Sequence, residues 1–173
     1  MGGGIGFGRR RSALAALLGV WIAVSPAWGL ADDRLAKAAM VLNIVLFVDW
    51  PEGEDRRKGC RLCVLQASAA LPALATIDGR MTPRGAMRIV PVDRPNQSAG
   101  CDIFYADRDD AAGPQGRGPI LIIGDREGLW SAGGVVEFVE RDGHLRFRIN
   151  HDEARARGLM VSSKLIGLAE SVR

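Results

Sequence analysis

Side chains that bind metals are scarce in this 173-residue chain, which has three cysteines and two histidines. Beside the C-x-x-C pair Cys60 and Cys63, only Cys101, His144 and His151 could complete a zinc site. These three are scattered along the chain, whereas a structural zinc site needs a second closely spaced pair of ligands. We therefore expect no metal site and no cofactor.

An excess of basic charge is also missing once the amino terminus is set aside. The chain has 23 Lys and Arg against 20 Asp and Glu, but residues 1–31 hold three arginines and no acid, which leaves 20 against 20 in the remainder. Binding to nucleic acid leaves a basic stripe or patch in the sequence, and none is present here. The charge therefore excludes nucleic acid as an expected partner.

Only one long apolar run occurs, and it lies near the start. The run "ALAALLGVWIAV" follows three arginines and precedes Ser25-Pro26 and the small-residue stretch "AWGLA". This order is typical of a secretory signal peptide, whereas a membrane span needs about 20 apolar residues. We predict that residues 1–31 are cleaved off after Gly29 or Ala31, and that residues 32–173 form one periplasmic domain without a transmembrane segment.

Helical and extended patterns alternate along the predicted mature chain. Apolar residues at helical spacing predict a helix over residues 34–50 that Asp32 or Asp33 caps and Pro51 ends; they are Leu35, Ala38, Ala39, Leu42, Leu46 and Phe47. Strands are expected over 61–66, 86–92, 101–106 and 119–123, a short helix over 67–76, a flexible loop over 107–118, and a hairpin over 135–150 that turns at Asp142-Gly143. One or two helices end the chain. This order predicts a single layered α/β domain: a mixed β-sheet flanked by helices, with a C-terminal β-hairpin followed by helices.

The C-x-x-C spacing has several interpretations. A redox pair of the thioredoxin type needs a following helix, but an apolar strand follows here. In a strand, Cys60 and Cys63 differ by an odd number of positions and point to opposite sides. The better partner for Cys63 is Cys101, near the start of another strand, because disulfides persist in an oxidising compartment. Cys60 then stays free or pairs between molecules.

Several longer stretches resemble one family in their order along the chain. "AKAAMVLNIVLFVDWP", "RLCVLQ", "CDIFYA", "ILIIGDREGLWSAGGVVEFVERDGHLRFRIN" and "ARARGLMVSSKLIGLAESV" are similar to the YfiR-like periplasmic proteins, and the resemblance covers Leu35 to Val172. It implies a repressor, not an enzyme, that binds the periplasmic sensing domain of a membrane-bound diguanylate cyclase and lowers cyclic-di-GMP. It also implies a structural disulfide between Cys63 and Cys101. Asp102 departs from the family, which usually has His at this position.

Each candidate binding residue also has a structural interpretation. Those considered for binding a partner or ligand are Trp50, Trp130, Gly133, Gly134, Asn150, Ser162, Ser163 and Lys164. The tryptophans can anchor a partner or pack in the core. The glycines can permit a turn, and Asn150 and Ser162 stand where helix caps are expected.

Two further functions stay open at this stage. An enzyme would need a nucleophile and a base within hydrogen-bond reach, which the adjacency of His151 to Asp152, or of Ser163 to Lys164, does not supply. A small-ligand sensor without a cyclase partner is the alternative, with its site in the loops 107–118 and 125–134 at the carboxyl ends of strands. Self-association through the first and last helices is a further expectation.

Overall fold

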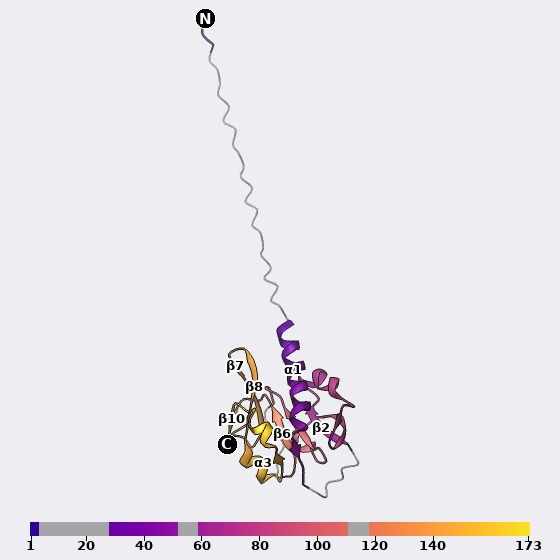
Figure 1. The fold of residues 1–173 in the computed structure, drawn as a ribbon. Helices are drawn as coiled ribbons and strands as arrows, with labels where there is room; N and C mark the ends of the chain where they lie inside the picture. Colours follow the sequence, from indigo (N-terminus) through magenta and orange to yellow (C-terminus); the bar gives the residue numbers. More distant parts are fainter. Residues whose placement is uncertain (4–27, 52–58, 111–117) are drawn as a thin grey trace.

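A computed structural model describes residues 1–3, 28–51, 59–110 and 118–173 (Figure 1). Most of the predicted signal peptide lies outside these residues, so its cleavage stays a prediction; both predicted cleavage points fall in the first turn of the first helix. In chain order the elements are α1 (Trp28–Val45), β1 (Val48–Asp49), β2 (Cys60–Leu65), α2 (Leu71–Leu74), the 3₁₀-helix η2 (Ala75–Ile77), β3 (Met81–Thr82), β4 (Gly85–Val92), the 3₁₀-helix η3 (Pro95–Gln97), β5 (Ile103–Ala106), β6 (Leu121–Gly124), β7 (Val136–Arg141), β8 (His144–Ile149), α3 (His151–Ala156), β9 (Met160–Val161), α4 (Ser163–Ile166) and β10 (Ser171–Val172).

One mixed sheet organises the domain, as the sequence predicts. Its eight strands lie in the order β10-β8-β7-β6-β5-β2-β4-β3. Strands β4, β2, β5, β6 and β7 are parallel to one another, and β3 and β8 each add an antiparallel partner. Strand β1 pairs with β9 in a separate two-stranded sheet. The predicted single α/β domain with a mixed sheet is therefore confirmed.

The strand order reverses between β2 and β5. After β2 the chain forms β4 on one side of it, then returns to place β5 on the other side, and β6 follows β5 outward. The connections that leave β2 and β5 therefore run in opposite directions across the sheet. In open α/β sheets such a reversal opens a crevice at the carboxyl ends of the strands, where ligands commonly bind.

The first helix differs from its prediction in both its ends and its buried face. It begins at Trp28, so Asp33 lies inside the helix and is no cap, and it ends at Val45, because the chain turns to form β1. The sheet-facing residues are Ala38, Val41, Ile44 and Val45, all at most 2% exposed, whereas Leu35 and Leu46 are 47% and 45% exposed. Apolar residues occur around most of this helix, so their spacing alone did not decide which of them face the sheet.

The other elements follow the predictions except for the short helix after β2 and the two-residue strands β3, β9 and β10, which the sequence does not predict. The hairpin β7–β8 turns at Asp142 and Gly143, which both have positive φ, as a tight two-residue turn requires. The short helix predicted over 67–76 is confined to α2 and η2, because the residues before Leu71 form a turn. Of the one or two helices expected at the end, two are present, α3 and α4, and the unpredicted strand β10 follows them. Most of the loop predicted over 107–118 lies outside the described residues.

Two apolar clusters lie on opposite faces of the sheet. Along β2, Cys60, Leu62 and Val64 belong to the larger cluster, which α1 and α2 cover, and Cys63 belongs to the smaller one. This alternation is the period of two expected of a strand. The described members of the smaller cluster lie on strands or loops: Cys63, Val92, Cys101, Phe104, Ala106, Ile122 and Leu129. One face of the sheet is thus covered by helices, and the other is closed around Cys63 and Cys101.

Candidate functional site

A small polar pocket lies at the carboxyl edge of the sheet, where the strand order reverses. Its volume is about 90 Å³. Its walls come from α1, from the turn after β2, and from the ends of β5 and β6; the lining residues are Asp33, Arg34, Lys37, Ala69, Ala70, Tyr105, Asp107, Arg108, Asp109 and Asp125. We call it the carboxyl-edge pocket. It falls in the region that the sensor interpretation expected, although that interpretation named only the loops.

A buried lysine forms the floor of the carboxyl-edge pocket. Lys37 is 7% exposed, and its Nζ lies 2.7 Å from Asp125 Oδ2 and 2.5 Å from Asp33 Oδ2. Burial opposes the charge of Lys37, but the hydrogen bonds to the two carboxylates outweigh it and raise the pKa of Lys37 above its usual value. The hydroxyl of Tyr105 donates to the second oxygen of Asp125 at 3.3 Å. The floor is therefore a charged network that holds α1 against the end of β6.

Asp107 fixes the two loops that border the pocket. Its Oδ2 accepts hydrogen bonds from the Ser68 hydroxyl at 2.5 Å and the Ala70 N–H at 3.1 Å, and its Oδ1 accepts one from the Arg108 N–H at 2.8 Å. Burial alone would raise the pKa of Asp107, but these hydrogen bonds outweigh it and lower the pKa. Asp107 is thus an ionised link between the turn after β2 and the loop after β5.

A second polar group surrounds Trp130, in the loop between β6 and β7. The guanidinium carbons of Arg148 and Arg173 lie 4.8 and 5.1 Å from the centre of the indole ring. The Glu137 carboxylate accepts a hydrogen bond from the backbone N–H of Trp130 at 2.9 Å and forms an ion pair with Arg148 at 3.1 Å. The Asn150 amide donates to the Trp130 carbonyl at 3.0 Å. We call these five residues the Trp130 cluster.

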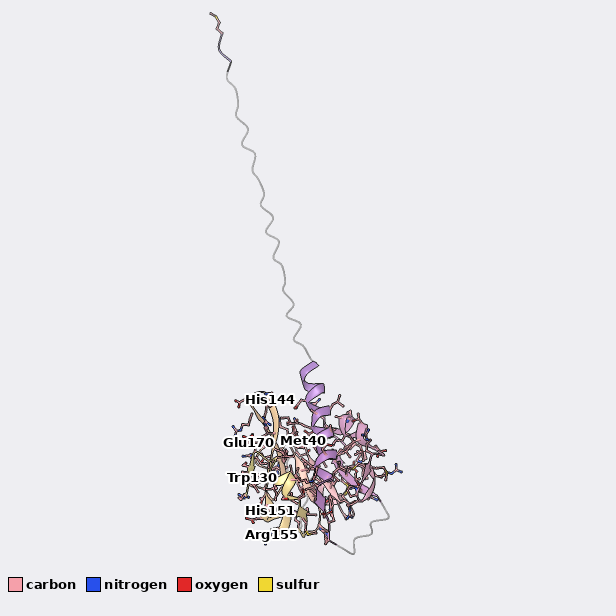
Figure 2. All side chains as sticks on the ribbon, viewed as in Figure 1. Met40, Trp130, His144, His151, Arg155 and Glu170 are labelled. Atoms are coloured by element: carbon pink, nitrogen blue, oxygen red, sulfur yellow. A yellow bond between two sulfur atoms is a disulfide. The ribbon has the colours of Figure 1, made fainter. Side chains whose placement is uncertain are left out.

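The Trp130 cluster lies at one side of the domain. Figure 2 shows Trp130, His151, Arg155 and Glu170 along the same side, with His144 at the tip of the hairpin above them. The His151 N–H donates to the carbonyl of Arg173 at 2.6 Å, which ties the start of α3 to the end of the chain beside the cluster. Trp130 is half-buried, so part of this aromatic and cationic surface faces outward.

The two candidate glycines shape the loop that carries Trp130. Gly133 has a φ of 88°, and its carbonyl accepts a hydrogen bond from Arg157 at 3.2 Å. A Cβ added at Gly134 would lie 2.4 Å from Leu129 Cγ, so no side chain fits there. The turn interpretation of both glycines accounts for what the structure shows.

Asn150 and Ser162 act as helix caps. The Asn150 Oδ1 accepts a hydrogen bond from the Glu153 N–H at 3.0 Å at the start of α3, and the Ser162 hydroxyl accepts one from the Leu165 N–H at 3.4 Å at the start of α4. Ser163 and Lys164 are exposed in the first turn of α4. The capping interpretation therefore accounts for Asn150 and Ser162.

Trp50 packs in the interior. It is 4% exposed, its indole N–H donates to the carbonyl of Asp102 at 3.3 Å, and the guanidinium of Arg84 lies 5.0 Å from the ring centre. Arg84 also pairs with the Asp102 carboxylate at 2.7 Å, and the Arg61 N–H donates to the other oxygen at 2.7 Å. Asp102, the departure from the family pattern, is thus neutralised by a cation of the same chain. As placed here, Trp50 offers no exposed anchor for a partner.

The cysteines are arranged as the sequence predicts. Cys63 and Cys101 form a disulfide with their Cα atoms 5.9 Å apart, and Cys60 is a free, fully buried thiol. Burial, aided by the negative charge of Asp102, raises the pKa of Cys60 to about 12. Cys60 is therefore a thiol at neutral pH and a poor nucleophile in the folded protein.

Sequence reasoning missed Asp33, Lys37 and Tyr105 as residues of the carboxyl-edge pocket, and it included Asp125 only as the first residue of a candidate loop. One signal was available, because Lys37 is a lone cation in the apolar stretch "LAKAAMVL", and a buried lysine requires a partner. Its partner Asp125 is 88 positions away, and no local pattern connects the two.

Comparison with known proteins adds one match. A family model described as YfiR/HmsC-like matches residues 35–170. No curated protein matches the chain in sequence. Within the described ranges, none of the helices combines the length and the apolar character that a membrane crossing requires. The family match spans most of the chain and nearly the whole described domain, and the chain belongs to the YfiR/HmsC-like family.

Proposed function

We propose that this protein is an exported regulator that binds the periplasmic domain of a membrane-bound diguanylate cyclase and represses it. The family match over residues 35–170 carries the proposal, since the proteins of this family are regulatory and not catalytic. Repression needs no chemistry from the regulator. A protein that binds the inactive state of the cyclase more tightly shifts the enzyme toward that state by the difference in affinity.

The Trp130 cluster is the surface we assign to this contact. Aromatic and arginine side chains contribute most strongly to protein interfaces, and here Trp130 is half-buried beside the guanidinium groups of Arg148 and Arg173. The side chains of Glu137 and Asn150 form hydrogen bonds with the backbone N–H and carbonyl of Trp130, which fixes the position of the indole before a partner binds. Trp50, the other candidate anchor, is buried and is left out of the proposed surface.

Co-expression with a membrane-bound diguanylate cyclase that has a periplasmic domain tests the proposal. We expect the exported protein to co-purify with the cyclase in detergent and to lower cellular cyclic-di-GMP. Arg173→Glu should weaken both effects by about tenfold, the equivalent of one lost charged contact. Arg80→Glu is the matched control, because Arg80 is also exposed but lies outside the Trp130 cluster. Equal repression by the two variants would remove the Trp130 cluster from the interface.

A second measurement separates regulation from catalysis. The purified protein, incubated with GTP or with cyclic-di-GMP, is expected to form or hydrolyse neither at a measurable rate. Repression should require export alongside the membrane enzyme. Turnover by the isolated protein would favour an enzyme and overturn the proposal.

A further inference from the structure

An apolar groove continues from the carboxyl-edge pocket. The groove lies between α1 and the start of α2, has a volume of about 260 Å³, and is lined by Arg34, Leu35, Ala69, Pro72 and Ala73. It shares Arg34 and Ala69 with the pocket, so the two spaces adjoin. Leu35 is 47% exposed on the wall of the groove. The polar chamber and the apolar groove thus lie side by side with a shared wall, and we call the two together the cleft.

The charges in the polar chamber fall into an inner and an outer set. In the inner set, Lys37 pairs with Asp125 and Asp33, and the ionised Asp107 accepts hydrogen bonds from Ser68 and the backbone, so each of these groups already has partners within the chain. The ammonium of Lys37 carries three hydrogens, and its two carboxylate partners leave one for a further acceptor.

The outer set presents both signs of charge at the mouth. Arg34 and Arg108 line it with guanidinium groups, and Asp109 and the partly exposed Asp33, one oxygen of which already pairs with Lys37, line it with carboxylates. Arg108 and Asp109 are exposed, and the side chain of Asp33 is 43% exposed. A ligand with a single charge would meet one group of its own sign, whereas a zwitterion can match both.

We propose that this cleft binds a small zwitterion with an aliphatic side chain, of the chemical class of norleucine. The ammonium group faces Asp33 and Asp109, the carboxylate faces Arg34 and Arg108, and the aliphatic chain lies along Leu35, Pro72 and Ala73. The volumes agree with this division, because a cavity of about 150 Å³ holds a benzene molecule. The chamber of about 90 Å³ therefore suits a head group of a few heavy atoms, and the groove of about 260 Å³ accommodates the tail.

The position of the cleft in the fold supports the same assignment. Strand order reverses between β2 and β5, and the cleft opens at their carboxyl ends, where α/β sheets bind ligands. The floor is rigid, because Lys37 and Asp107 join α1, the turn after β2 and the ends of β5 and β6. The inference does not depend on the cyclase partner, since binding is measured on the exported protein alone.

Calorimetric titration with three related compounds tests the assignment. Norleucine carries both charges and a four-carbon chain, hexanoate lacks the ammonium group, and pentylamine lacks the carboxylate. We expect norleucine to bind saturably, and the other two to bind at least about tenfold more weakly, the equivalent of one lost charge contact. Absence of saturable binding by norleucine, or equal affinity for hexanoate or pentylamine, would overturn the proposal.

Variants of exposed residues locate the site without endangering the fold. Arg108→Gln and Leu35→Ser should each weaken norleucine binding by about tenfold or more, through loss of the carboxylate contact and of the apolar wall. Arg146→Gln and Leu168→Ser are the matched controls, since both residues are exposed and line neither space. Thermal unfolding of all four variants should match that of the parent protein. Unchanged affinity in Arg108→Gln and Leu35→Ser would place any binding elsewhere and refute the assignment.

Discussion

Replacing Cys63 and Cys101 together by alanine is expected to lower the free energy of unfolding by about 4 kcal/mol. The disulfide joins positions separated by 38 residues, and closing a loop of this length removes about 13 cal/mol/K of entropy from the unfolded chain. At room temperature that entropy corresponds to about 4 kcal/mol. Both sulfur atoms also pack in the smaller apolar cluster with Phe104 and Ile122, so their removal adds a packing loss to the entropic one.

Chemical denaturation at neutral pH measures this change. Urea unfolding should give a clearly lower midpoint for the double variant and a somewhat steeper slope, because the unlinked unfolded chain exposes more surface. Cys60→Ala is the matched control, because Cys60 is equally buried but lies in the larger cluster and makes no link. Its loss of one buried sulfur should cost about 1 kcal/mol. Peptide mapping under non-reducing conditions should recover Cys63 linked to Cys101, and Cys60 should react with an alkylating reagent only after unfolding.

Three results would refute this reasoning. The double variant could lose no more stability than Cys60→Ala, which would show that the disulfide does not stabilise the fold by the predicted amount. Mapping could recover a Cys60–Cys63 disulfide, which would contradict the opposite directions of these side chains in β2. Stoichiometric zinc in the purified protein would restore the interpretation of the cysteines as metal ligands.

Two further predictions concern buried ionisable groups. Lys37→Met leaves the carboxylate of Asp125 buried without its cation and should lower the free energy of unfolding by about 3 kcal/mol. The double variant Lys37→Met/Asp125→Leu removes both members of the pair and should recover at least half of this loss, as measured by urea denaturation. A double variant that is no more stable than Lys37→Met would contradict the argument. The raised pKa of Cys60, about 12 against an ordinary value of 9.0, adds stability below pH 9 that is lost as the pH rises toward 12, by about 1.4 kcal/mol per pH unit. Cys60→Ala should therefore lose less stability than the parent between pH 8 and about pH 10.5, and equal losses would exclude this cause.

Part of the fold could be predicted from the sequence because short-range physics decides it. The apolar runs of β5 and β6 can only be strands covered on both faces, and every residue of the two strands is buried. Asp142-Gly143 selects the turn of the hairpin, because both positions need a positive φ. Alternation along β2 points Cys60 and Cys63 to opposite sides of the strand, which disfavours a disulfide between them.

The tertiary structure alone decided which side chains meet. The face that α1 buries depends on contact with the sheet, since apolar residues occur around most of the helix. Strand β10 forms because its two residues reach the open edge of the sheet and pair with β8. Its own sequence does not predict this pairing. Lys37 and Asp125 are 88 positions apart, and they meet only because strand order brings the end of β6 under α1. A lone lysine in an apolar helix indicates that a buried partner is required. Which residue becomes that partner depends on the packing of the whole chain, and no local pattern predicts it.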